Sequence, residues 1–116
     1  MPLAVANVVV ATIPNAQAVS DIVPIGTRGI LGILMPAAWT AAAITFSAGV
    51  DGAAVSDVTD AAGAEIAIAS AGAVAGKFVL APASIAALRG FVRVRSGTGA
   101  APVNQGAQRL LTLVLG

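Results

Sequence analysis

The sequence predicts an all-β fold, an antiparallel β-sandwich or jelly roll of about eight to nine strands with at most one short helical turn. Two observations lead to this prediction. Apolar runs rich in β-branched residues recur about every ten residues, with Gly, Pro, Asp and Ser between them, a spacing typical of such folds. The length of 116 residues suits one domain, so residues 1–116 are expected to form a single sandwich.

The first half of the chain contains four expected strands: residues 7–13, 18–23, 30–35 and 43–48. Proline follows each of the first three runs, and Asp51-Gly52, a hairpin-turn signal, follows the fourth. The segment before Pro14 carries almost no polar side chain. We therefore expect residues 1–13 to pair in a sheet as an N-terminal strand or arm, within the subunit or with a neighbour.

The second half contains five expected strands: residues 55–59, 65–69, 75–80, 91–95 and 109–115. One helical turn is expected at residues 82–88, because Pro82 suits a first helical turn and Gly90 lies just past its end. The alanine-rich runs 37–43 and 69–76 lack an apolar stripe of helical period, so they are not expected to be helical.

The composition argues against catalysis. The chain has no Cys, His or Tyr, so the usual neutral-pH base, thiol nucleophile and commonest metal ligands are missing. We therefore predict a protein that is not an enzyme, with no catalytic, cofactor-binding or metal-binding residues. A net charge of +1 also provides no strong field to attract nucleic acid.

Hydrophobic residues make up 58% of the chain and charged residues 9%, whereas an ordinary globular domain has about 25% charged residues. The uncharged run of residues 29–50 is long enough for a membrane helix, but Pro36 and Trp39 in its middle argue against one. Without a membrane, the chain is expected to cover its surface with other protein subunits.

Three residues are candidate interface contacts: Trp39, Arg93 and Arg95. Trp39 is the only tryptophan, and it is either a core or edge-capping side chain or an interface anchor. Arg93 and Arg95 project from the same face of a strand, which is either solvated, ion-paired or in contact with a partner.

Other polar motifs have ordinary structural interpretations. Residues 26–29 (GTRG) lack the rest of a phosphate-binding loop and are expected to form a turn. Asp51, Asp57 and Asp60 do not have the spacing of an EF-hand calcium loop and are expected to stabilise turns.

Several segments together resemble a family of viral proteins. They are residues 36–40 (PAAWT), 44–47 (ITFS), the Asp51-Gly52 turn, 93–98 (RVRSGT) and 102–105 (PVNQ). Over residues 29–115 the chain is similar to small structural proteins of tailed bacteriophages, which include capsid-decorating (cement) and head-fibre-like proteins. The strand that ends before Asp51-Gly52 also resembles jelly-roll modules of the discoidin type, although Ala53, Ala54 and Val55 stand where those modules commonly have an aromatic residue.

The resemblance implies a virion protein that decorates and reinforces the capsid by bridging major capsid protein subunits, made in the bacterial host cytoplasm. The expected partners are that coat protein and further copies of the chain, with a homotrimer as the expected oligomer, and neither nucleic acid nor membrane. A head–tail, tail or fibre subunit is the alternative. A carbohydrate-binding jelly-roll module is a more distant alternative, because only 3% of the residues are aromatic and sugar sites commonly use exposed Trp or Tyr.

Overall fold

The computed structural model describes residues 7–116, which form nine strands and one four-residue helix. The elements are β1 (Asn7–Ile13), β2 (Val19–Gly26), β3 (Ile30–Leu34), β4 (Ile44–Gly49), β5 (Ser56–Asp57), β6 (Ala67–Ile68), β7 (Phe78–Leu80), α1 (Ala83–Ala86), β8 (Gly90–Ser96) and β9 (Arg109–Leu115). The all-β class predicted from the sequence is therefore confirmed.

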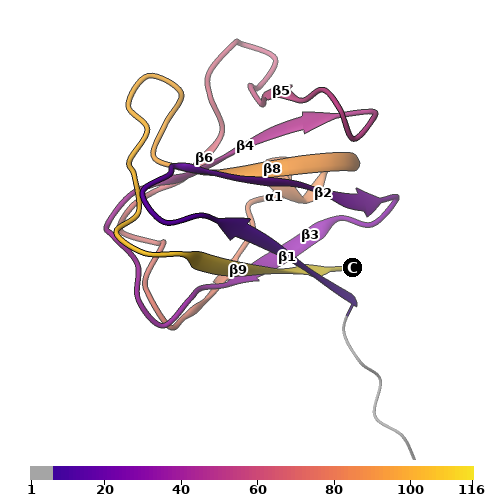
Figure 1. Ribbon diagram of the computed structural model, residues 1–116. Helices are drawn as coiled ribbons and strands as arrows, with labels where there is room; N and C mark the ends of the chain where they lie inside the picture. Colours follow the sequence, from indigo (N-terminus) through magenta and orange to yellow (C-terminus); the bar gives the residue numbers. More distant parts are fainter. Residues whose placement is uncertain (1–6) are drawn as a thin grey trace, which may run out of the picture.

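Two antiparallel sheets face each other across the core (Figure 1). One sheet has the strand order β1-β9-β3-β7, and the other has the order β2-β8-β4-β5, with β6 also paired to β4. Four nested antiparallel pairs, β1 with β9, β2 with β8, β3 with β7 and β4 with β5, generate this order. Such a long, wrapped antiparallel strip divided between two sheets is the jelly-roll form of the sandwich.

The core is built by strand alternation, since every second side chain points inward. The inward side chains of Leu111 and Leu113 in β9 are fully buried. Those of Val92 and Val94 in β8, which belongs to the opposite sheet, are also fully buried. Phe46 of β4 is the largest fully buried side chain among the described residues. These residues form one continuous apolar cluster, which holds the two sheets together.

Some predicted strand boundaries are wrong. The strand expected at residues 75–80 begins only at Phe78, because residues 74–77 form a turn in which Gly76 has a φ of +74°. The expected strand 18–23 continues to Gly26 as β2, since Pro24 lies on an edge strand where it needs no hydrogen-bond donor. The strands expected at 55–59 and 65–69 shorten to two residues each.

The predicted helical turn is present as α1, where Ile85 is buried in the core. The alanine-rich runs at 37–43 and 69–76 contain no helix, as predicted. The expected pairing of the N-terminal segment is confirmed for β1, which pairs with β9 from Asn7↔Leu115 to Ile13↔Arg109 within the same subunit. Residues 1–6 of that segment lie outside the described residues.

Candidate interaction surfaces

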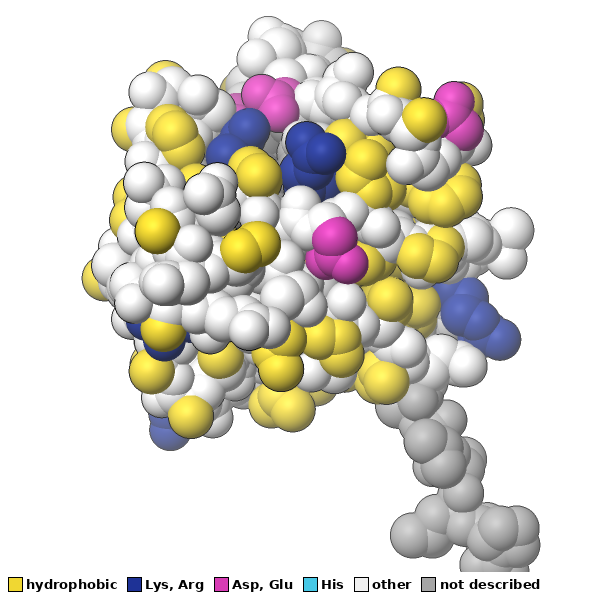
Figure 2. Space-filling model, viewed as in Figure 1, with side chains coloured by type: hydrophobic (Ala, Val, Ile, Leu, Met, Phe, Trp, Pro, Cys, Tyr) yellow, Lys and Arg dark blue, Asp and Glu magenta, His cyan; other side chains and the backbone are white. Residues whose placement is uncertain are grey.

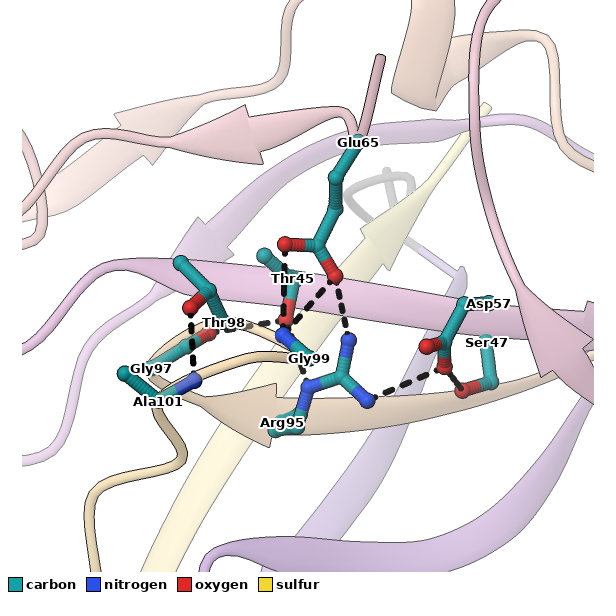
Figure 3. Close-up of polar contacts among 9 residues, drawn as sticks. All are labelled: Thr45, Ser47, Asp57, Glu65, Arg95, Gly97, Thr98, Gly99 and Ala101. Carbon is teal, nitrogen blue, oxygen red and sulfur yellow. Dashed lines mark hydrogen bonds and ion pairs between the residues drawn. The ribbon is translucent and has the colours of Figure 1, made fainter. Parts of the chain in front are cut away.

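The outer side of the β2-β8-β4 sheet carries a charged cluster centred on Arg95. Its guanidinium lies between two carboxylates (Figure 3), donating from Nη1 to Asp57 Oδ1 at 3.0 Å and from Nη2 to Glu65 Oε2 at 2.5 Å. Its Nε donates to Thr45 Oγ1 at 2.9 Å. The Arg95 side chain is only 11% exposed. Arg95 is therefore ion-paired, which is one of the alternatives that the sequence left open for the arginine face.

This cluster joins segments that are far apart in the sequence. Glu65 also accepts a hydrogen bond from the Gly99 N–H at 3.0 Å, and Thr45 donates to the Gly97 carbonyl at 2.8 Å. Arg95 thus holds the β5–β6 segment directly, through Asp57 and Glu65. Its partners Glu65 and Thr45 in turn hold the loop after β8 on the outer side of this sheet. The same covering explains why Thr45, although it points outward, is fully buried.

Asp57 is the exposed member of the cluster, with half of its side chain accessible to solvent. The hydrogen bond from Arg95 lowers the pKa of the Asp57 carboxyl below its ordinary value of 3.8, and the hydrogen bond from Ser47 acts in the same direction. Partial burial opposes both effects. The charged form of Asp57 is therefore the one that the folded chain stabilises.

Arg93 lies two residues before Arg95, opposite Ile22 of β2 and Ser47 of β4. Its side chain forms no ion pair within the described residues, and its buried Nε has no hydrogen-bond partner. The buried Nε is out of reach of an outside group, but the Arg93 side chain is partly exposed, so a carboxylate from outside the chain could pair with the accessible part of its guanidinium. Of the two arginines, Arg93 is the one that stays a predicted partner contact.

Trp39 lies in the loop between β3 and β4 and packs, half-buried, against the core cluster. Its Nε1 is 3.4 Å from the Ala42 carbonyl, to which it donates. This is the core-packing position that the sequence allowed as one alternative. A contact between a partner and the exposed part of the ring stays a prediction.

Gln105 is a central residue that the sequence did not single out. It is 1% exposed, and its side chain donates to the Thr40 carbonyl and to Ser96 Oγ and accepts hydrogen bonds from the Thr40 N–H and Arg109 Nε. Its main chain is also bonded to Ala16 and Gln17. Gln105 thereby ties three loops together at one end of the sandwich and holds the residue next to Trp39.

The predicted turn aspartates divide into two kinds. Asp51 accepts hydrogen bonds from the N–H groups of Ala53 and Ala54, and Asp60 accepts them from those of Ala62 and Ala64. Both therefore stabilise turns, as expected. Asp57 is instead part of the Arg95 cluster, so the turn role predicted for it is wrong. The expected turn after β2 is present, but it spans residues 25–28, where the Arg28 N–H donates to the Ile25 carbonyl.

The outer side of the other sheet, β1-β9-β3-β7, is apolar. Its outward side chains include six large hydrophobic groups that are each between 42% and 76% exposed: Val8, Val10, Leu34, Phe78, Leu80 and Leu110. Leu31, at the bulge in β3, adds a seventh that is 52% exposed. We call these seven residues the apolar face. Figure 2 shows hydrophobic side chains along the lower margin of the molecule and also in its upper right part.

The sequence held a signal for the apolar face. In the runs 7–10 (NVVV) and 110–115 (LLTLVL), apolar residues occupy both the odd and the even positions, so both faces of each strand are apolar. A strand with one solvated face instead alternates between apolar and polar residues. The acidic side chains lie mainly in the upper half of the view in Figure 2, whereas Lys and Arg side chains occur in both halves. In the four strands of this sheet the only charged residue is Arg109, which bonds to Gln105 and Thr40 rather than projecting from the apolar face.

Comparisons with protein-family models, curated proteins and solved structures give no match for this chain. Within residues 7–116, no three His, Cys, Asp or Glu side chains are grouped in a way that could hold a metal ion. The same part of the chain contains no helix long and apolar enough to cross a membrane.

Proposed function

We propose that this chain is a structural subunit of a phage virion that decorates the capsid and reinforces it by bridging major capsid protein subunits. One observation carries the assembly part of the proposal: the apolar face is an exposed sheet surface that lacks charged side chains. Contiguous exposed apolar surface of this kind marks an interaction site on a soluble protein. The viral part of the proposal is supported by the sequence resemblance.

The fold agrees with this role without being specific to it. Double-sheet jelly rolls occur in viral shell proteins, but also in lectins and other proteins. Two of the segments that carry the phage resemblance, residues 36–40 and 102–105, meet in space through the bonds between Gln105 and Thr40. The shared motif therefore has a structural role, which is to close one end of the sandwich.

Reinforcement follows from linked binding. A subunit that contacts neighbouring coat proteins adds contacts that exist only in the assembled shell, so mass action favours the shell over free coat protein. Several such sites on one oligomer raise the overall affinity, even where each contact is weak. Arg93, which is partly exposed and forms no ion pair within residues 7–116, supplies one contact that would suit a coat carboxylate.

The test is cosedimentation of the purified chain with assembled shells of the same phage and, separately, with unassembled coat protein. We expect saturable binding to shells and little binding to free coat protein, because a single coat subunit presents only part of the composite site. Arg93→Ala should weaken shell binding by about tenfold, a typical effect of removing a charged hydrogen-bond donor at an interface. Arg89→Ala is the matched control, since Arg89 bonds to the carbonyls of Ala86 and Leu88.

Absence of shell binding, combined with binding to isolated tails or fibres, would replace the capsid role by the head–tail, tail or fibre role. In either case the virion is the expected location, after synthesis in the host cytoplasm.

A further inference from the structure

We propose that the apolar face is the surface through which copies of this chain bind one another. This inference rests on the proposed function only in that both require assembly. Beyond the proposed function, it specifies that the β1-β9-β3-β7 side of the sandwich faces other copies and that the opposite side stays available to the shell.

The exposed large hydrophobic side chains of residues 7–116 are concentrated on this one sheet. Only Val19, Val50 and Val74 lie elsewhere. On the apolar face the side chains follow the strand register: Val10 lies level with Thr112, Leu34 and Phe78, and Val8 lies level with Val114, Gly32 and Leu80. The surface is therefore a continuous sheet face rather than a set of scattered side chains.

The size of the apolar face fits a stable contact. Seven side chains that are each 42% to 76% exposed present apolar surface on the order of a few hundred Å². A standard interface buries about 800 Å² on each partner, of which somewhat more than half is apolar. The face thus supplies most of the apolar area that one side of such an interface needs.

The absence of charge favours a second copy as the occupant. Two copies of a charge-free face meet without like-charge repulsion, and each removes from water what the other exposes. A different protein is usually selected by complementary charge, which the apolar face does not offer, and the ion pairs of residues 7–116 lie in the Arg95 cluster on the opposite sheet. Figure 2 shows acidic side chains in the upper half of the view and hydrophobic ones along the lower margin.

The sheet edges favour contact through the face over addition of strands. β1 and β2 are each an edge strand of their sheet. Asp21 Oδ1 accepts a hydrogen bond from the Thr12 N–H of β1 at 2.9 Å, so this N–H cannot bond to an added strand. The β2 edge is further protected by an irregular register around Asp21 and by Pro24, which has no N–H. A symmetric contact through the face closes into a defined oligomer, and these two strand edges are poorly suited to addition of further strands.

The experiment is analytical ultracentrifugation of the purified chain and of two variants, Leu110→Glu and Leu34→Glu. Both side chains are about half exposed, so the folded subunit tolerates the change, which circular dichroism and thermal unfolding verify. Val50→Glu is the matched control, since Val50 is 95% exposed and lies in the loop after β4. We expect the unchanged chain and the Val50 variant to form the same closed oligomer, and each face variant to associate about tenfold more weakly or worse.

A dimer or a trimer satisfies the inference, and the measured mass separately tests the trimer expected from the sequence. An unchanged chain that remains monomeric at tens of micromolar, or an oligomer that both face variants leave intact, would overturn it. A monomer whose shell binding is lost in Leu110→Glu would assign the face to the coat protein, which overturns the inference and leaves the capsid role standing. Self-association through the face without shell binding would support the inference and contradict the capsid role.

Discussion

The side-chain amide of Gln105 binds the backbone of Thr40 from both sides, accepting from its N–H at 2.8 Å and donating to its carbonyl at 3.1 Å. These residues are 65 positions apart, and together they reproduce the pair of bonds that a strand neighbour would make. The loop that carries Trp39 is thereby held in place although it contains no regular secondary structure.

Replacing Gln105 should destabilise the whole domain. Gln105→Ala removes a buried side chain and leaves the Thr40 N–H and carbonyl and the Ser96 hydroxyl without their bonds to it, so we expect a loss of about 2–3 kcal/mol in the free energy of unfolding. Denaturant unfolding measures this loss. Thr40→Ala is the control, because it keeps the backbone bonds and removes only long contacts of the hydroxyl at 3.4 Å; its effect should stay below about 1 kcal/mol. Equal effects of the two variants would contradict the importance assigned to the amide.

Arg95 is expected to have a structural effect of similar size. Arg95→Ala leaves Asp57 and Glu65 without their shared cation and uncovers Thr45, so we expect a loss of about 1–3 kcal/mol. Hydrogen exchange should show that residues 56–65 and 97–101 lose protection together, because the guanidinium holds Asp57 and Glu65, and Glu65 in turn binds the Gly99 N–H. Loss of protection in only one segment would show that the cluster does not join them.

The Asp57 carboxyl gives this cluster a pH dependence. Since the folded chain lowers the pKa of Asp57 below 3.8, its contribution to stability is present above 3.8 and is lost as the pH falls through the lower folded value. The carboxyl is half exposed, so solvent screening keeps the contribution small. In acid titrations of thermal stability, Asp57→Asn should be less stable than the unchanged chain at neutral pH, and the difference should narrow below pH 3.8. A difference that is constant with pH would contradict this assignment.

Deleting residues 2–13 should prevent normal folding. The deletion removes β1, exposes the backbone edge of β9 along its full length and takes the buried Ala11 and Ile13 out of the core. An exposed edge of this kind promotes aggregation. We expect insoluble or misassembled protein, measured by light scattering after expression. A matched deletion of residues 2–6 leaves β1 intact, and a soluble, fully assembled 2–13 deletion would show that β1 is dispensable.

The sequence predicted the long strands well, because alternation and β-branched residues are local signals in β1, β8 and β9. It did not predict the strand order, since the pairing of Asn7 with Leu115 is a contact between the two ends of the chain. It could not find Gln105, which stands in a Gly- and Ala-rich loop without any periodic pattern. Asp57, Glu65 and Arg95 were visible as separate charges, but only the folded sheets bring them together.

The reinforcing role is tested most directly by the survival of phage particles on heating at low salt. Particles made without this protein should lose infectivity or release DNA at a lower temperature than decorated ones, and adding purified protein should restore their stability. Protein carrying Arg93→Ala should restore it less well, whereas Arg89→Ala should restore it fully. If undecorated particles survive as well as decorated ones, the chain does not reinforce the capsid.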